Sequence, residues 1–361
     1  MVFNHITLGQ RVLFGTGMAA EHVTQEIQQH GARRVMVITS ARDVSTGKNL
    51  VADQRVSVRW TQVAQHVPAD LAARARWAAQ EAQADLLVAL GGGSAIGLGK
   101  AIALTTRLPL IAVPTTYAGS EATDMWGLTE NGVKTTGTAA QVLPIAVVYD
   151  STLSTTLPVE LSVSSGINAL AHCVDSLWAP RADPINQAMA LEGARALGTA
   201  LPQIVLDPLG QQAREQALYG CYLAAVAFAS AGSGLHHKIC HTLGGAFNLP
   251  HAQTHAVVLP HVLAFNAPGA PVASGRLAAT LGAVPPHDDD APATAVTALT
   301  HLLHQVDAPT ALADLGLTGT DIPEAVQRVV SAAPSSNPVP VTESGVRRLL
   351  EAALTGRHPV L

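Results

Sequence analysis

Short apolar runs alternate with helical segments along the first 150 residues. The runs have hydrophobic side chains at nearly every position, which is typical of strands buried on both faces of a parallel sheet. They lie at 33–39, 56–60, 85–90, 109–114 and 143–150. Between them, residues 69–84 and 94–107 have helical spacing, and 125–137 favours a hairpin that turns at Asn131 and Gly132. The alternation predicts a mostly parallel, doubly wound sheet.

The pattern changes after Asp150. The stretch STLSTTLPVEL offers capping residues and a proline at a helix start, and Ala- and Leu-rich helical segments dominate beyond it. We therefore predict an α/β dinucleotide-binding domain of the Rossmann-like kind at 1–152 and an all-α domain at 153–361. One run without charged side chains, 216–235, has the length of a membrane span. Its Ala, Gly and Ser content favours a helix buried in a protein core instead.

Composition and charge narrow the classes of function. Hydrophobic residues make up 48% of the chain, charged residues 13%, and the formal net charge is -5. This balance provides no electrostatic attraction for nucleic acid. The N-terminal stretch lacks the pattern of a signal peptide. The three cysteines have no C-x-x-C spacing, as expected for reduced thiols. We expect a cytoplasmic protein with neither a nucleic-acid nor a membrane partner.

A glycine turn between a strand and a helix is the first candidate site. In LVALGGGSAIGLGKAIAL, glycines let the backbone approach a ligand, and the helix N-terminus offers unpaired N–H groups to a phosphate. The spacing G-x-G-x-x-x-G differs from the usual dinucleotide fingerprint and from a P-loop. A tight turn that binds nothing is the alternative. The residues predicted to hold a pyrophosphate are Gly91, Gly92, Gly93 and Ser94.

Hydroxyl side chains follow the next strand, in PTTYAGSEATD. Ligands of open α/β sheets bind at the carboxyl ends of the strands, so these groups are candidates for the nicotinamide or the substrate. A solvated Ser/Thr loop is the alternative reading. The candidates are Thr115, Thr116, Tyr117 and Ser120.

Histidines gather in the helical half of the chain. Asn168 and His172 are four residues apart, as are His237 and His241, so each pair shares one helical face. His251 follows after a turn-like segment. Such groups from two helices and a loop can form a metal site. By contrast, His236, His255 and His261 are expected to be ordinary core or surface histidines.

The motifs GGGSAIGLGKAIA, PTTYAGSEATD, YDSTLSTTLP, GINALAH and HHKICHTLGGAFNLPH occur in the order seen in the iron-containing alcohol dehydrogenase superfamily, which the chain resembles from about residue 10 to 350. The resemblance implies the dehydroquinate synthase-like architecture, with the active site between the two domains. It also places the metal ligands at Asn168, His172, His237 and His251, and an additional active-site histidine at His241.

One of these positions departs from the family pattern, because Asn168 stands where the family has aspartate. An amide oxygen is a weaker, neutral donor, so affinity for a dication should fall. From this we expect no metal and a vestigial site.

The resemblance also implies the chemistry. The expected reaction is NADH-dependent reduction of the carbon–carbon double bond of a small dicarboxylate enone, which needs an oxyanion stabiliser and a proton donor. Histidines 172, 237, 241 and 251 would share these roles, and Lys238 with protonated histidines would hold the carboxylates. Lys134 matches a family lysine near the ribose. Thr39 and Ser40 stand where an acidic residue would favour NAD, so NADPH is left open as a second donor. A homodimer is the family expectation.

Three other functions compete with this one. The first is a metal-dependent alcohol or aldehyde oxidoreductase in which Asn168 completes a weak site. The second is a sugar-phosphate lyase of the dehydroquinate-synthase kind, which would need more cations than this histidine-rich segment offers. The third is a dinucleotide-binding protein without catalytic activity, against which the number of acid–base groups argues.

Overall fold

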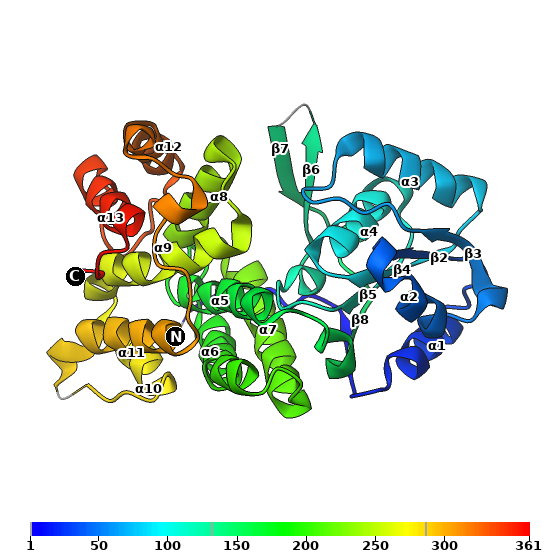
Figure 1. The fold of residues 1–361 in the computed structure, drawn as a ribbon, viewed down its shortest axis with the longest axis horizontal. Helices are drawn as coiled ribbons and strands as arrows, with labels where there is room; N and C mark the ends of the chain where they lie inside the picture. The colour runs from blue at the N-terminus through cyan, green and yellow to red at the C-terminus, as the bar shows by residue number, and fades with distance from the viewer. Residues whose placement is uncertain (1, 131–132, 286) are drawn as a thin grey trace. The chain divides into compact units, whose positions relative to one another are not determined.

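The computed structural model describes residues 2–130, 133–285 and 287–361. It divides into two compact units. One comprises Leu8–Leu157, and the other comprises Pro158–Leu361 together with residues 2–7 (Figure 1). The division thus falls at Leu157 rather than near residue 152, and the N-terminal residues pack with the helical unit.

The first unit is built on a parallel sheet of six strands in the order β1-β8-β5-β4-β2-β3. The strands are β1 (Arg11–Phe14), β2 (Val35–Thr39), β3 (Val56–Trp60), β4 (Leu86–Gly91), β5 (Leu110–Pro114) and β8 (Ala146–Tyr149). This confirms the predicted doubly wound sheet. Strand β1 was not predicted, because it is a short edge strand that is largely exposed. The connection from β2 leads to β3 at one edge of the sheet, whereas the connection from β4 leads to β5 in the opposite direction. The topological switch point therefore lies between the adjacent strands β2 and β4.

Helices cover both faces of the sheet (Figure 1). Helices α1 (Ala19–Gln29) and α2 (Val44–Leu50) pack on one face, and α3 (Ala69–Glu81) and α4 (Gly93–Thr106) pack on the other. Successive strand residues therefore point into two different apolar cores. Strands β6 (Met125–Glu130) and β7 (Val133–Thr138) pair antiparallel, as predicted. The predicted turn at Asn131 and Gly132 lies outside the described residues.

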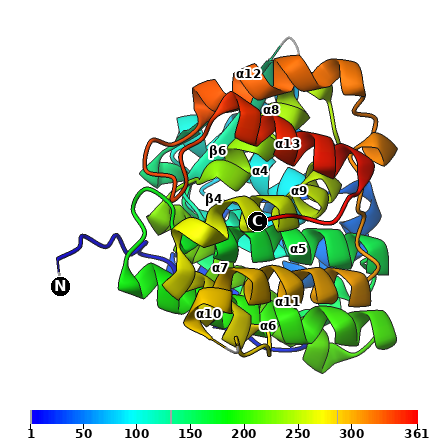
Figure 2. The same cartoon turned by 90° about the vertical axis from the view of Figure 1, so that its left-hand side faces the viewer.

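The second unit is helical in the part of the chain that the structure describes (Figure 2). Its long helices are α5 (Val159–Ser176), α6 (Pro184–Leu206), α7 (Gln211–Ala231), α8 (Leu235–Phe247), α9 (His251–Asn266), α10 (Pro271–Thr280), α11 (Ala291–Gln305), α12 (Ile322–Ala332) and α13 (Glu343–Thr355). Helices α8, α9, α12 and α13 share one apolar core. Small residues such as Gly193 and Gly220 let α6 and α7 approach closely.

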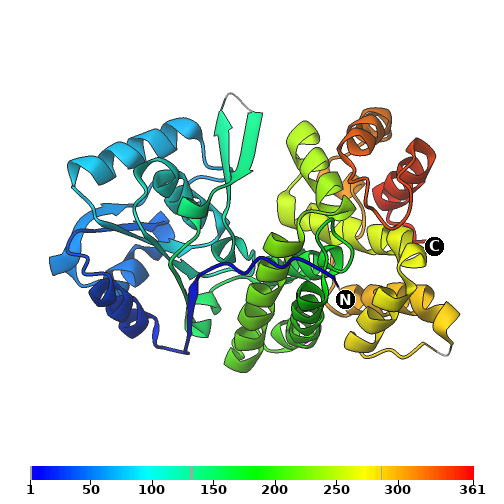
Figure 3. The ribbon, with the colours of Figure 1, turned by 180° about the vertical axis from the view of Figure 1, so that it is seen from behind.

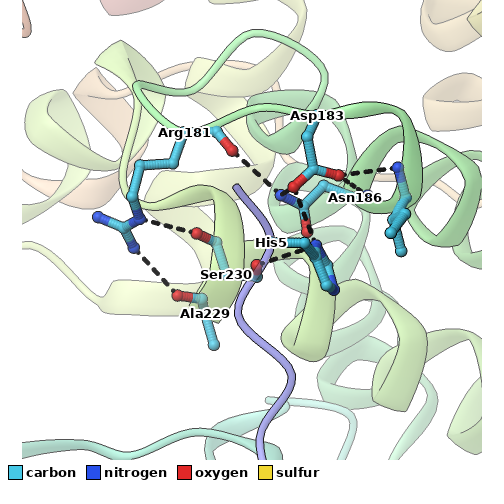
Figure 4. Close-up of polar contacts among 7 residues, drawn as sticks. His5, Arg181, Asp183, Asn186, Ala229 and Ser230 are labelled. Atoms are coloured by element: carbon cyan, nitrogen blue, oxygen red, sulfur yellow. Dashed lines mark hydrogen bonds and ion pairs between the residues drawn. The ribbon is translucent and has the colours of Figure 1, made fainter. Parts of the chain in front are cut away.

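The N-terminal segment is pinned to this helical unit. Figure 3 shows the segment crossing α7, and Figure 4 shows His5 among polar groups of that unit. His5 Nδ1 lies 2.9 Å from Asp183 Oδ2. The other oxygen of Asp183 accepts from the backbone N–H groups of Ile185 and Asn186 at the start of α6. Asp183 therefore both caps a helix and holds the N-terminal segment.

The uncharged run at 216–235 lies mainly in α7, much of which is buried in the helical unit. No single helix among the described residues is long and apolar enough to cross a membrane. Helices α7 and α8 meet those criteria only as a pair, with a bend of 97° between them.

Candidate active site

The glycine turn lies at the carboxyl edge of the sheet, at the end of β4 and the start of α4. Gly91 has a φ of 139°, a conformation that side chains rarely adopt. A Cβ on Gly92 would lie 2.9 Å from Thr116 Cγ2, whereas a Cβ on Gly93 would have no atom within 4 Å. The turn thus packs against the loop after β5 and presents its open side at Gly93. This open backbone at a helix N-terminus fits a pyrophosphate.

The predicted hydroxyl groups lie at the same edge. The Thr115 N–H donates to the Gly91 carbonyl over 3.2 Å, so the loops after β4 and β5 are joined. Thr115, Thr116 and Ser120 are half-buried, like Ser94, whereas Tyr117 is fully buried. Tyr117 therefore belongs to the core beneath the loop. Thr39 ends β2, the strand beside β4.

The carboxylate of Asp43 also lies at this edge of the sheet, although the residues expected to face the ribose, Thr39 and Ser40, are not acidic. Ser40 Oγ donates to Asp43 Oδ2 over 2.6 Å. Asp43 ends the short turn that follows β2 and so stands near the position where acidic residues bind ribose hydroxyls. The side chain of Lys134 lies outside the described part of the structure.

Lys100 holds the segment that follows β5 in place through contacts with its backbone carbonyl groups. It is buried on α4, and its Nζ lies 2.6 Å from the Ser120 carbonyl, 2.7 Å from that of Thr123 and 2.8 Å from that of Met125. Burial lowers the pKa of Lys100 to about 7, against the opposing effect of Glu121 and Asp124. Sequence reasoning missed this residue.

Six histidines from three helices form a second constellation, which we call the histidine cluster. His172 comes from α5, His236, His237 and His241 from α8, and His251 and His255 from α9. His236, His237 and His255 are buried, His172 is half-buried, and His241 and His251 are exposed. The cluster therefore runs from the core of the helical unit to its surface. Lys238 is half-buried beside it on α8.

Ring contacts connect all six members. The ring centroids of His172 and His237 are 4.9 Å apart, and Phe228 stacks on His172 and lies tilted against His237. His255 lies 4.9 Å from His237 and 4.4 Å from His251. The four predicted histidines do come together, but His255 and His236, expected to be ordinary, lie among them. His251 is the first residue of α9 rather than part of a loop, so the spacing of His251 and His255 repeats that of His237 and His241.

Burial keeps the inner imidazoles neutral. Burial, with mutual repulsion between the rings, lowers the pKa of His172 and of His236 to about 3 and that of His237 well below its ordinary value. The same causes lower the pKa of His255. At pH 7 these rings are imidazoles with lone pairs, so a role in holding the substrate carboxylates as cations does not suit them. Neutral imidazole is the form that binds metal ions.

Several nitrogen and oxygen atoms of this region are buried without a hydrogen-bond partner among the described residues. They are Asn168 Oδ1, His172 Nδ1, Asp175 Oδ1, His236 Nδ1, His237 Nε2 and His255 Nε2. Buried polar atoms are rarely left unpaired in proteins. His236, Cys240 and His255 also bring three potential ligand atoms within 4.8 Å of one another. Burial raises the pKa of the Cys240 thiol, which weakens it as a ligand. The donor types and their unpaired atoms fit a metal ion.

Comparison with known proteins gives matches over the whole chain. A family model described as iron-containing alcohol dehydrogenase matches residues 9–151, and one for the C-terminal part of the Fe-containing alcohol dehydrogenase family matches 162–354. Maleylacetate reductase of Sphingobium indicum is 43% identical over 100% of this chain and 99% of its own length.

Two solved structures extend the comparison. The iron-containing alcohol dehydrogenase of Corynebacterium glutamicum gives a TM-score of 0.94 at 54% identity, over 98% of this chain and 97% of the other. Maleylacetate reductase of Agrobacterium tumefaciens gives a TM-score of 0.92 at 38% identity, over 99% and 100%.

These findings overturn the expectation that the protein binds no metal. The family model is that of iron-containing enzymes, and the histidine cluster contains a group of potential ligands. The inference from Asn168 failed because it considered the amide and three imidazoles and left out the neighbouring donors His236, Cys240 and His255.

Proposed function

The chain belongs to the iron-containing alcohol dehydrogenase family, and from that premise we propose that it is a maleylacetate reductase. The observation that carries this function is the 43% identity to a maleylacetate reductase along the full length of both chains. The reaction consumes maleylacetate, NADH and a proton, and yields 3-oxoadipate and NAD⁺. Hydride adds to the alkene carbon β to the ketone, and the resulting enolate takes up the proton.

We assign the nicotinamide cofactor to the carboxyl edge of the sheet. Gly91, Gly92 and Gly93 with the N-terminus of α4 would hold the pyrophosphate, because this turn offers open backbone at Gly93. Thr115 and Thr116 would flank the nicotinamide. The cofactor supplies the hydride, and the protein's part is to hold it in place. NADPH is a second donor to be tested against NADH.

We assign a metal ion to the histidine cluster. The proposed donors are Asn168, His172, His237 and His251, with His236, Cys240 and His255 as the competing set. The first set is favoured because three of its atoms, Asn168 Oδ1, His172 Nδ1 and His237 Nε2, are buried without a partner in the described structure. In the second set, His236 Nε2 and His255 Nδ1 lie 2.8 Å apart and are used on each other, which leaves one unpaired nitrogen on each ring. Burial also raises the pKa of the Cys240 thiol, which weakens the third donor of that set. A bound cation supplies a Lewis acid for charge developing on the ketone oxygen.

The outer histidines suit the proton transfer. His241 and His251 are exposed, with ring centroids 6.1 Å apart, so they can exchange protons with solvent. The inner rings, whose pKa values are lowered by burial, stay neutral and bind rather than donate. Because His251 is among the proposed metal donors, we place the proton donor at His241. Lys238 on α8 would hold a carboxylate of the substrate. A homodimer remains a prediction, to be tested by sedimentation.

The decisive experiment follows NADH oxidation with maleylacetate, using protein depleted of metal and protein reloaded with iron or zinc. Turnover with maleylacetate supports the proposal. The 54% identity to a protein described as an iron-containing alcohol dehydrogenase favours a second candidate, oxidation of alcohols. Turnover of simple alcohols or aldehydes without turnover of maleylacetate would select that candidate.

A further inference from the structure

Asp175 is a buried carboxylate in direct contact with the histidine cluster. It is fully buried on α5. Its Oδ2 lies 2.8 Å from His237 Nδ1 and accepts from the Gly234 N–H over 2.9 Å and, more weakly, from the His237 N–H over 3.4 Å. The carboxylate therefore caps the N-terminus of α8 from a neighbouring helix, where the helix dipole favours negative charge.

The contact decides which nitrogen of His237 carries the hydrogen. The same oxygen of Asp175 already accepts from backbone N–H groups of α8, so it acts as an acceptor toward the ring as well; Nδ1 then carries the hydrogen and the lone pair is on Nε2. His237 Nε2 is the buried atom without a partner. His172 stacks on the His237 ring and Phe228 packs against it at a tilt, and both limit its rotation. The ring is thus held in one orientation and one tautomer, as a metal-binding histidine needs.

Asp175 is also the acidic group in hydrogen-bond contact with these donors. The proposed donors are an amide oxygen and imidazoles, none of which carries a negative charge. A dication surrounded only by neutral donors would be costly to bury. Among the described contacts of the inner histidines, the carboxylate within hydrogen-bond distance is that of Asp175.

We propose that Asp175 is a positioning residue for the cation site, which fixes the Nδ1–H tautomer of His237 and places, one imidazole away, the carboxyl group that the site lacks at Asn168. The inference rests on the proposed metal site, but its tests do not depend on activity toward maleylacetate.

The first test measures metal affinity in competition with a chromophoric chelator, using Zn²⁺ as the probe. Asp175→Asn removes the charge while keeping an acceptor for Nδ1, and should weaken binding by about 10- to 100-fold. The matched control is Asp183→Asn, which alters another buried carboxylate of the same unit, also paired with a histidine and capping a helix (Figure 4). The control should bind Zn²⁺ like the wild type.

A compensating variant sharpens this test. Asn168→Asp in the Asp175→Asn background returns a carboxylate to the site and should recover the lost affinity. Unchanged affinity in Asp175→Asn, or an equal loss in Asp183→Asn, would overturn the proposal.

The second test uses the wild-type protein without metal, so it holds even if Asp175→Asn does not fold. Nitrogen NMR correlations of the imidazole rings should show the His237 hydrogen on Nδ1 and an unprotonated Nε2. Hydrogen found on Nε2 would contradict the proposal, whatever the substrate of the enzyme is.

Discussion

Gly234 is the residue that lets Asp175 approach α8, and its replacement by alanine is the sharpest test of that packing. A Cβ at Gly234 would lie 2.3 Å from Asp175 Oδ1 and 2.7 Å from Cγ. Both distances are too short for atoms in contact, and Asp175 is held by its own hydrogen bonds. The backbone of Gly234 has φ -89° and ψ -167°, which alanine adopts without strain. Gly234→Ala therefore tests the contact rather than the backbone.

The expected cost can be worked out from two effects. Forcing an extra methyl into a packed site costs about 1 to 3 kcal/mol. Alanine is also a poorer N-cap than glycine, by up to about 1 kcal/mol. Gly234→Ala should thus lower the free energy of unfolding by about 1 to 4 kcal/mol. Displacement of Asp175 should also weaken Zn²⁺ binding, because His237 loses the acceptor for Nδ1.

The matched control is Gly245→Ala in the same helix. A Cβ at Gly245 would have no atom within 4 Å, so the change should raise stability by about 0.5 to 1 kcal/mol through helix propensity. Urea unfolding of both variants and of the wild type gives the comparison, and chelator competition gives the metal affinity. If Gly234→Ala were as stable as the wild type and bound Zn²⁺ equally well, the packing argument would be refuted.

Three further predictions follow from the structure. Burial lowers the pKa of Lys100 from its ordinary value of 10.5 to about 7. Between pH 7 and pH 10.5 the unfolded chain therefore binds a proton that the native protein does not, so the free energy of unfolding should rise with pH in this range. Urea midpoints across that range should rise more steeply for the wild type than for Lys100→Met, and parallel profiles would contradict this. Gly93→Ala should leave unfolding unchanged, because its Cβ meets no protein atom, yet weaken NADH binding about tenfold or more in a fluorescence titration; unaltered binding would remove Gly93 from the cofactor site. Asn168→Asp should tighten Zn²⁺ binding and raise KM for the dianionic substrate, and a lower KM would refute the charge argument.

The sheet and the glycine turn could be predicted from sequence because their signals are local. Apolar runs of five or six residues next to glycines define β4, β5 and the turn at Gly91 without reference to distant parts of the chain. Strand β1 was not found this way, because its apolar run is only three residues long and its edge position leaves most of it exposed. The same holds for Lys100, whose carbonyl partners lie 20 to 25 residues further along the chain.

The histidine cluster was predictable in part. Spacing of four residues identified His172, His237 and His241, but the same spacing from His251 to His255 was not used. Asp175 follows Asn168 by seven residues, a spacing that again places both side chains on one face of a helix. The signal was therefore present in the sequence. The pairing of Asp175 with His237 is a contact between α5 and α8, and only the fold reveals it.

The substitution at Asn168 changes the electrostatics of the site more than its number of donors. A carboxylate that binds a cation directly cancels part of the cation's charge, so the cation exerts a weaker positive field on the side that faces the substrate. Asp175 lies behind His237, one imidazole further away, and Coulomb attraction falls with distance. A cation held in this way is bound less tightly but keeps more of its positive field toward the ligand. Maleylacetate carries two carboxylates and develops further negative charge on its ketone oxygen, so this redistribution favours binding and reduction of a dianion over those of a neutral alcohol or aldehyde.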